Sequence, residues 1–497
     1  MNLLLITADQ WRGDTLGHLG HACVRTPHLD ALAAEGTSFA RHYSVTAPCG
    51  PARASLLTGL YAHNHRSILN GTPLDGRLTN LALELRKAGY APTLFGYTDT
   101  SADPAGLASS DPRLFSYEGV LPGFDVGQLL LEDFRPWLAW LARRRGAALE
   151  THPPIHEPVD GRLGGAARYT AAESETQFLA DAAIDWLSTR RGERWCAHVS
   201  FLRPHPPWNA PAEYLALYAD AEIPPPRRAA TAEADAAVHP LQAAVQAQTL
   251  IRSFVPGFEG RMSALDAVSV RDLRRAYYAL MTEIDHHVGR LLDFLRDSGQ
   301  LDDTLVVFTS DHGECLGDHH LFGKRGYAEP AFHIPLIVRQ PGGRRGARVD
   351  AFTESVDVMP TILAALGIEV PAACDGRALT PFLAGSGPAD WRRAAHWEVD
   401  YRDLLGPSAP ALGSDPEAAS LVVHRADDHA YVHFAAAPPL LFDLREDPAW
   451  TRNRADDPGA AATRASCMSD LLSWRLRHED RRMSNLRVTS QGLIRWR

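Results

Sequence analysis

Apolar runs of strand length alternate with longer amphipathic segments over most of the chain. The runs that suit buried strands lie at 3–7, 93–96, 196–201, 305–309 and 335–338. The segments with apolar residues at helical spacing lie at 29–35, 78–88, 176–188 and 272–297. Buried strands that alternate with helices are typical of a parallel sheet covered on both faces. The pattern therefore predicts an α/β fold, with a mostly parallel sheet and helices on both of its faces.

Two stretches interrupt this alternation, at 100–170 and 206–265. Both are rich in proline, alanine and charged residues. Long segments of this kind inside an α/β fold are uncommon, and most of them are functional loops. We predict that they are insertions over one edge of the sheet, where lids and subunit contacts are both open roles.

The pattern changes again near residue 375, where short strands replace the long alternation. Such strands are predicted at 421–424 and 430–433, with a closing helix at 465–477. We therefore predict a large catalytic α/β domain over 1–374 and a small α+β domain over 375–497. The tail, 485–497, has no evident partner in the sequence, so we expect it to pack on another subunit.

The composition of the chain excludes some classes of protein. The chain has 497 residues, 45% of them hydrophobic, and a net charge of −10, which is ordinary for a globular protein but not for a nucleic-acid binder. The first residues are typical of a strand and not of a leader, and we find no apolar run of membrane-spanning length. The six cysteines are scattered without framework spacing, so we expect reduced thiols in the cytoplasm.

The segment Cys49-Gly-Pro-Ala-Arg53 has the features of a site that makes a nucleophile. Pro51 suits the first turn of a helix, which would place Cys49 where unpaired N–H groups favour negative charge. Arg53 follows about one turn later on the same face and adds a fixed cation that can hold an oxyanion. The alternative is a buried, inert free cysteine, which is the usual fate of a lone intracellular thiol.

Two of the predicted strands are followed by side chains of the kinds that bind metals. They are Asp9 and Gln10 after 3–7, and Asp311 and His312 after 305–309. Ligands of open α/β sheets bind at the carboxyl ends of the parallel strands, so we expect convergence on one divalent cation, with Cys49 as a further ligand. Carboxylates, an amide oxygen and an imidazole suit an octahedral, hard-to-borderline ion. Aspartates at strand ends can instead cap the next helix, but here both strands end in this way.

Cys49-Gly-Pro-Ala-Arg53 resembles the C-x-P-x-R signature of the type I sulfatases, a family of the alkaline phosphatase superfamily. Further segments that resemble this family lie at 309–324, 355–361 and 441–448. The resemblance implies an alkaline-phosphatase-like fold. It also implies that a formylglycine-generating enzyme converts Cys49 to formylglycine, whose hydrate attacks the substrate ester.

Within the family, the chain is more similar to bacterial phosphonate monoester hydrolases and their sibling arylsulfatases. Typical sulfatases have an aspartate where Gln10 stands and an asparagine where His312 stands. Segments 70–75 and 203–208 also resemble the phosphonate monoester hydrolase pattern. Because an imidazole ligand favours transition metals, we expect manganese first, with calcium or magnesium as the alternatives.

The same resemblance implies roles for residues outside the metal site. It assigns His205 and Lys324 to the non-bridging oxygens and the leaving group of the substrate, and Asn70 to substrate binding. Without the resemblance, a histidine in a proline-rich loop is more often structural and a lone lysine is more often only solvated. These three residues are therefore predicted from similarity alone.

The segment Gly96-Tyr-Thr-Asp99 differs from the usual sulfatase sequence in a way that affects which substrate is expected. Many sulfatases carry Gly-Lys-x-His here, so a phenol and a carboxylate replace two cations. We expect Tyr97 and Asp99 to face the substrate and to disfavour dianionic phosphate monoesters relative to monoanionic esters. Asp99 also departs from the phosphonate monoester hydrolase pattern, in which a threonine-like residue is expected. The alternative is that Asp99 turns outward and does not act on the substrate.

The sequence thus predicts a formylglycine- and metal-dependent hydrolase of monoanionic esters. The first prediction is an arylsulfatase that also has phosphonate monoester hydrolase and phosphodiesterase activity. The alternative is an enzyme that is mainly a phosphonate monoester hydrolase or phosphodiesterase and has sulfatase activity as a side reaction. Two other functions are less favoured. A two-metal phosphatase or phosphomutase needs more metal ligands than this sequence offers, and a non-catalytic binding protein would not need the metal ligands that the sequence retains. The expected partners are a small sulfate or phosphonate ester, the maturation enzyme and further copies of the chain in a dimer or tetramer, without nucleic acid or membrane.

Overall fold

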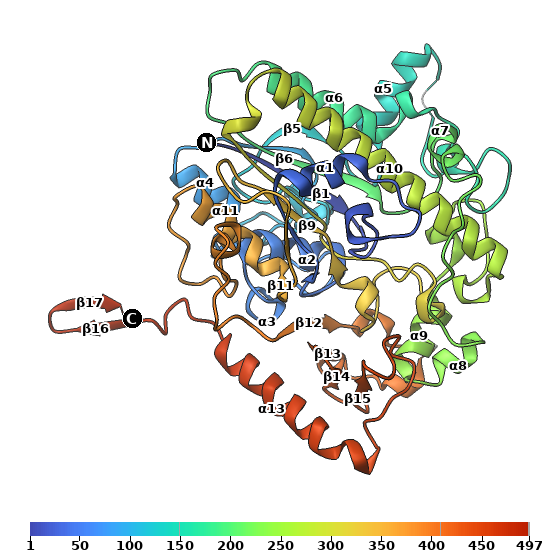
Figure 1. Ribbon diagram of the computed structural model, residues 1–497, viewed down its shortest axis with the longest axis vertical. Helices are drawn as coiled ribbons and strands as arrows, with labels where there is room; N and C mark the ends of the chain where they lie inside the picture. Colours follow the sequence, from blue (N-terminus) through green and yellow to red (C-terminus); the bar gives the residue numbers. More distant parts are fainter. Residues whose placement is uncertain (149, 408, 496–497) are drawn as a thin grey trace.

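The centre of the molecule is an eight-stranded sheet with helices on both faces (Figure 1). The structure is a computed structural model that describes residues 1–148, 150–407 and 409–495. In spatial order the strands are β10 (Ala347–Val349), β2 (Thr37–Phe39), β9 (Leu336–Arg339), β7 (Thr304–Thr309), β1 (Asn2–Asp9), β6 (Cys196–Pro204), β4 (Pro92–Gly96) and β5 (Asp125–Leu129). All neighbours are parallel except the two pairs that include β9. The predicted α/β class with a mostly parallel sheet is confirmed.

Alternate residues of β1 build a core on each face of the sheet. Leu4 and Ile6 pack with α1, α6 and α10, whereas Leu3 and Leu5 pack with α2, α4 and α11. Successive side chains of a strand point to opposite faces, so a strand covered on both faces is apolar throughout. The helices are α1 (Pro27–Glu35), α2 (Cys49–Thr58), α3 (Ala62–His65), α4 (Leu81–Lys87), α5 (Arg135–Arg145), α6 (Glu175–Ser188), α7 (Ala212–Ala216), α8 (Ala232–Ala236), α9 (Pro240–Gln248), α10 (Ala267–Asp297), α11 (Val358–Ala365), α12 (Thr380–Leu383) and α13 (Ala461–Arg477).

The predicted helices are present, but two begin elsewhere than expected because of their caps. The segment predicted at 78–88 begins at Leu81, since the side chain of Asn80 accepts a hydrogen bond from the Leu83 N–H. The helix predicted at 272–297 begins earlier, at Ala267, where Asp266 accepts from the Ser269 N–H at 2.7 Å. Capping side chains, and not apolar spacing, set the first residue of these helices.

The stretch 100–170 contains an element that the sequence analysis did not predict. Strand β5 lies within it and pairs in parallel with β4 as an edge strand of the central sheet. Its sequence, Asp-Val-Gly-Gln-Leu, has no apolar alternation, and its first three residues are exposed. An edge strand with one weakly covered face gives little hydrophobic signal. The stretch 100–170 therefore contributes a strand to the central sheet, in addition to the insertion that was predicted over the sheet edge.

The C-terminal part is built on an antiparallel sheet. Its strands are β12 (Ala394–Asp400), β13 (Ser420–Ala426), β14 (His429–Phe434) and β15 (Leu440–Asp443). The strands predicted at 421–424 and 430–433 are β13 and β14, and the predicted closing helix is α13. A small three-stranded sheet consists of β11 (Thr353–Glu354), β3 (His42–Tyr43) and β8 (His333–Ile334). Throughout the described ranges, every helix falls short of the length or apolar content that a bilayer crossing requires.

The tail forms a hairpin of β16 (Leu486–Thr489) and β17 (Gly492–Arg495) that extends away from the rest of the chain (Figure 1). Its apolar side chains are exposed, with Val488 83% and Leu493 64% accessible. A two-stranded hairpin is marginally stable on its own in water. Contact of this tail with another subunit stays a prediction.

Glu283 on α10 is expected to make stability depend on pH. Its side chain is buried, and burial together with the Glu175 carboxylate raises the pKa of Glu283 to about 8. Between about pH 4 and pH 8 the native chain keeps a proton that the unfolded chain has lost, so stability falls by up to about 1.4 kcal/mol per pH unit.

We expect Glu283→Gln to melt at a higher temperature than the wild type near about pH 8 and to lose this advantage near about pH 4. Thermal melts followed by circular dichroism across this range measure the difference. Glu193→Gln is the control, because Glu193 is exposed in a surface loop. A difference that is constant with pH contradicts the expectation.

Candidate active site

Four buried side chains that can bind a metal converge where β1, β7 and α2 meet. Asp9 ends β1, Asp311 and His312 directly follow β7, and Cys49 is the first residue of α2. Their ligand atoms all lie within 4.8 Å of one another. The structure thus brings together four residues that the sequence placed at the ends of separate elements, and we call them the metal cluster.

His312 presents its ring in the form that binds metals. Its Nδ1 lies 3.0 Å from the Gly313 carbonyl, which can only accept, so Nδ1 carries the proton. The lone pair on Nε2 then faces the cluster, 3.2 Å from Cys49 Sγ and 3.8 Å from Asp9 Oδ1. Burial lowers the pKa of His312, which keeps the imidazole neutral. A ring oriented by a carbonyl on its other nitrogen is typical of metal-ligating histidines.

Arg53 lies behind the two carboxylates and fixes their orientation. Its Nε donates to Asp311 Oδ2 and its Nη2 donates to Asp9 Oδ2, each at 3.0 Å. Its Nη1 donates to the Tyr97 carbonyl at 3.0 Å and to Ser200 Oγ at 2.7 Å. All three guanidinium nitrogens therefore have protein acceptors. Arg53 positions the metal ligands in this structure, and contact of its charge with an oxyanion remains a prediction.

The electrostatic balance of the cluster suits one divalent cation. Burial alone raises the pKa of Asp9, but the charges of His205 and Arg53 hold it well below its ordinary range. Asp9 is therefore ionised, and its Oδ1 faces His312 and Cys49. An ionised carboxylate and a neutral imidazole are the protonation states in which these side chains bind a divalent cation. The residues present fit a metal ion.

Gln10 is held between a cation and a carboxylate. Its Oε1 accepts a hydrogen bond from Lys324 Nζ at 2.8 Å, and its Nε2 donates to Glu314. Its backbone N–H donates to Asp311 Oδ1 at 3.1 Å, which explains a left-handed φ of 66° directly after β1. Ligation of metal by the Gln10 amide stays a prediction. Glu314 was not singled out from the sequence, although it lies in the same polar run as Asp311.

Tyr97 is buried beneath the cluster. Its hydroxyl donates to Asp9, and the Arg53 guanidinium lies 4.1 Å from the centre of its ring. Burial raises the pKa of Tyr97 well above its ordinary value, so the phenol stays protonated and remains a donor. The structure thus places this predicted substrate-binding residue on a metal ligand.

Two cavities are lined by residues predicted to contact the substrate. Asn70 and Lys324 line a cavity of about 350 Å³, whose other wall comes from the end of β12 and from Tyr401. Asn70 is exposed, and its Oδ1 accepts from the Gly50 N–H at 2.9 Å. His205 lines a second cavity of about 470 Å³, together with Glu132.

His205 directs one ring nitrogen toward the second cavity. Its Nδ1 lies 2.8 Å from the Pro206 carbonyl and therefore carries a proton. Its Nε2 lies 4.0 Å from Glu132 Oε1. Glu132 lies just after β5, in a stretch for which the sequence analysis predicted no site residue.

Comparison with known proteins now assigns the chain to a family. The sulfatase family profile matches residues 1–368. The chain belongs to the sulfatase family. A second profile, described as the C-terminal part of N-sulphoglucosamine sulphohydrolase, matches residues 317–477. The suspected resemblance is confirmed.

Individual sulfatase-family relatives match the whole chain. The multifunctional alkaline phosphatase superfamily protein PehA of Trinickia caryophylli is 42% identical, with 99% of this chain and 98% of that protein aligned. The phosphonate monoester hydrolase of Agrobacterium radiobacter is 45% identical, with a TM-score of 0.96 over 100% of this chain and 99% of that one. The phosphonate monoester hydrolase of Silicibacter pomeroyi is 42% identical, with a TM-score of 0.94 over 100% of this chain and 99% of that one. This member of the sulfatase family is a sulfate or phosphonate ester hydrolase.

Asp99 of this sulfatase-family chain is buried, not turned outward. Its side chain is 2% exposed, and neither carboxyl oxygen has a hydrogen-bond partner among the described residues. Its backbone has a left-handed φ of 50°. Burial, opposed by the Arg53 charge but reinforced by Glu132, raises the pKa of Asp99 to about 8. Asp99 is therefore enclosed in the protein, and its contact with substrate stays a prediction.

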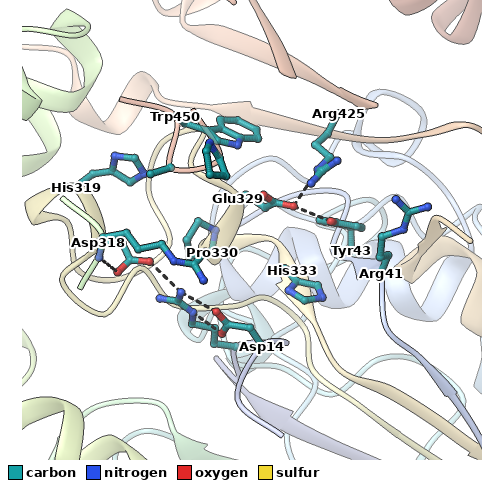
Figure 2. A pocket seen from close by; sticks show the side chains of 14 residues that line it. Asp14, Arg41, Tyr43, Asp318, His319, Glu329, Pro330, His333, Arg425 and Trp450 are labelled. Carbon is teal, nitrogen blue, oxygen red and sulfur yellow. Dashed lines mark hydrogen bonds and ion pairs between the residues drawn. The ribbon is translucent and has the colours of Figure 1, made fainter. Parts of the chain in front are cut away.

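A third cavity, of about 280 Å³, lies between the loop after β1 and the C-terminal sheet (Figure 2). Glu329 accepts from Arg425 at 2.9 Å and from Tyr43 at 2.7 Å. Asp14 and Asp318 both pair with Arg12, at 2.6 and 2.9 Å. No member of the metal cluster is among the described residues that line it. The pair of Glu329 and Arg425 joins the segment before β8 to β13 of the C-terminal sheet, and we assign these ion pairs a structural role.

Proposed function

We propose that the chain is a formylglycine- and metal-dependent hydrolase of phosphonate monoesters and phosphodiesters, with sulfate esters as further substrates. The observation that supports this order is the pair of cavities, one at Lys324 and one at His205. A sulfate monoester carries one organic group, whereas a phosphodiester or phosphonate monoester carries two. Two cavities at one site suit the phosphorus esters better than the arylsulfatase that the sequence analysis put first.

The charge of the site supports monoanionic substrates. Tyr97 and Asp99 stand where many sulfatases have cations, and Tyr97 is committed to Asp9. Burial by itself lowers the pKa of Lys324, but the charges of Asp9 and Asp311 contribute to raising it, so the lysine keeps its charge. Lys324 beside a buried carboxyl group favours a single negative charge over two.

We propose that Cys49 is oxidised to formylglycine, because the unmodified thiol is a poor nucleophile here. Burial and the Asp9 carboxylate raise the pKa of the Cys49 thiol well above its ordinary value. The hydrate of formylglycine supplies one hydroxyl that attacks and a second whose deprotonation expels the transferred group. A divalent cation, for which manganese is our first choice, supplies positive charge for the nucleophile and for the transition state.

The residues of the chain then have distinct tasks. Arg53 holds Asp9 and Asp311 in their ligand orientation. Lys324 and His205 together serve the non-bridging oxygens and the leaving group of the substrate. We also propose a cytoplasmic homo-oligomer, matured by a formylglycine-generating enzyme. The exposed apolar side chains of the tail hairpin support the oligomer.

The proposed preference is tested with one aryl leaving group on four esters. We expect kcat/KM to be highest for the phosphonate monoester and the phosphodiester, lower for the sulfate, and lowest for the phosphate monoester by at least about 10-fold, because its second charge finds no cation at positions 97 and 99. Steady-state kinetics of the manganese-loaded enzyme give the order. A preference for the phosphate monoester dianion contradicts the proposal.

A further inference from the structure

The cavity of about 350 Å³ at Lys324 borders the start of α2. Pro48, the residue directly before Cys49, lines this cavity. Asn70 lines it as well, and its Oδ1 accepts a hydrogen bond from the N–H of Gly50, the residue directly after Cys49. The cavity therefore lies beside the position at which we propose that the nucleophile forms.

The lining of this cavity is apolar once its ion pairs are taken into account. Apart from Lys324, its charged side chains are paired: Asp403 with Arg325 and Asp400 with Arg402, each at 2.9 Å. Paired charges at a cavity offer little to a charged ligand. Most of the other described residues that line it are apolar, namely Ala47, Pro48, Leu69, Val399, Tyr401 and Leu404. The cavity therefore suits an uncharged, apolar group.

Leu69 has apolar surface without a partner in the core. Its side chain is half-buried, yet none of the hydrophobic cores formed by the described residues includes it. Tyr401 and Leu404 are instead buried in the core of the C-terminal sheet, so their part of the lining is fixed. An apolar cavity of about 150 Å³ accepts benzene, so this larger cavity has room for an aryl group.

The place of the cavity beside the nucleophile indicates which part of the ester it takes. In an in-line displacement the leaving group departs on the side opposite the attacking oxygen. The groups that stay on phosphorus lie between these two directions. A cavity that borders both chain neighbours of Cys49 is therefore placed for a group that stays, and not for the one that leaves.

We propose that the cavity at Lys324 is the subsite for the organic group that stays on phosphorus, and that this group is apolar and of aryl size. This inference rests on the proposed function, because a phosphonate monoester or phosphodiester keeps such a group and a sulfate monoester does not. Leu69 contacts the group from the loop after α3, and Tyr401 and Leu404 contact it from the C-terminal part of the chain. The C-terminal part thus helps to select the substrate.

Three p-nitrophenyl esters with the same leaving group test this proposal: the phenylphosphonate, the methylphosphonate and the sulfate. The first keeps an aryl group, the second keeps a methyl group, and the third keeps no organic group. We expect Leu69→Ala and Leu404→Ala each to lower the phenylphosphonate-to-methylphosphonate ratio of kcat/KM by about 10-fold relative to the wild type, because apolar lining is lost. The phenylphosphonate-to-sulfate ratio is expected to fall as well. Steady-state kinetics of the manganese-loaded enzyme give both ratios, which are independent of the fraction of correctly folded enzyme.

Ile68→Ala is the matched control. Ile68 is the chain neighbour of Leu69 and is also half-buried, but it is not among the described residues that line this cavity. We expect it to keep both wild-type ratios. If Leu69→Ala and Leu404→Ala also keep them, the inference alone is overturned. An equal fall for all three esters overturns it too, because the cavity would then hold the leaving group that they share. A wild type that hydrolyses the sulfate but neither phosphonate overturns the proposed function, and this inference with it.

Discussion

Cys49→Ala is expected to lower kcat/KM by at least about 10⁴-fold for every ester that the wild type hydrolyses. Cys49 begins α2 inside the metal cluster, 3.2 Å from His312 Nε2, so its replacement removes the precursor of the nucleophile and a ligand position together. The buried methyl group of alanine fills part of the same space, so the fold is expected to survive. Steady-state kinetics and metal content measure the effect.

Cys49→Ser separates the two halves of the proposed reaction. A serine hydroxyl can attack once, but it has no second hydroxyl whose deprotonation expels the bound phosphoryl group. We expect a covalent adduct on the Ser-containing peptide without turnover, detected by mass spectrometry. In the wild type, the same peptide is expected to carry the aldehyde, and an unmodified thiol in fully active enzyme contradicts formylglycine.

Cys196→Ala is the control for this series. Cys196 is also buried but lies in β6, outside the metal cluster. We expect it to keep wild-type metal content and kcat/KM. If Cys49→Ala behaved in the same way, the metal cluster would not be the site of catalysis.

Three residues of the metal cluster could be placed together from the sequence because they lie at the ends of apolar strands. Asp9 follows one buried run and Asp311 another, and parallel strands bring their carboxyl ends to one edge of the sheet. His312 follows Asp311 directly, so its place was also fixed. In this way the sequence predicts that these side chains lie close together, but not how each side chain is oriented. The ring orientation of His312 depends on a carbonyl, which no residue type signals.

The surroundings of the metal cluster could not be predicted, because they depend on contacts between distant segments. Arg53 donates to groups from β1, β6 and the loops after β4 and β7, and Ser200 has no motif that announces it. Glu132 lies after an edge strand that lacks apolar alternation, so its approach to His205 had no signal. Tyr97 and Asp99 were found only as departures from a family pattern, and their burial required the structure.

Arg53→Lys is expected to be far from conservative. A lysine ammonium offers donors from one atom, whereas the guanidinium of Arg53 reaches Asp9, Asp311 and Ser200 from three nitrogens. We expect kcat/KM to fall by about 10²-fold, because the metal ligands lose their fixed orientation. We also expect manganese to dissociate more readily, as measured by metal analysis after dialysis.

Arg53→Met removes the charge altogether and leaves two buried carboxylates without their counter-ion. In metal-free buffer we expect this to lower the free energy of unfolding by about 3–5 kcal/mol. Excess manganese is expected to restore much of the loss, because the dication neutralises the same carboxylates. Arg392→Met is the matched control, since Arg392 pairs with buried Asp357 and Glu354 away from the metal cluster. It is expected to lose stability that manganese does not restore. An Arg53→Met variant as insensitive to manganese as Arg392→Met would mean that the two carboxylates do not bind the metal, so this comparison tests the metal cluster without depending on turnover.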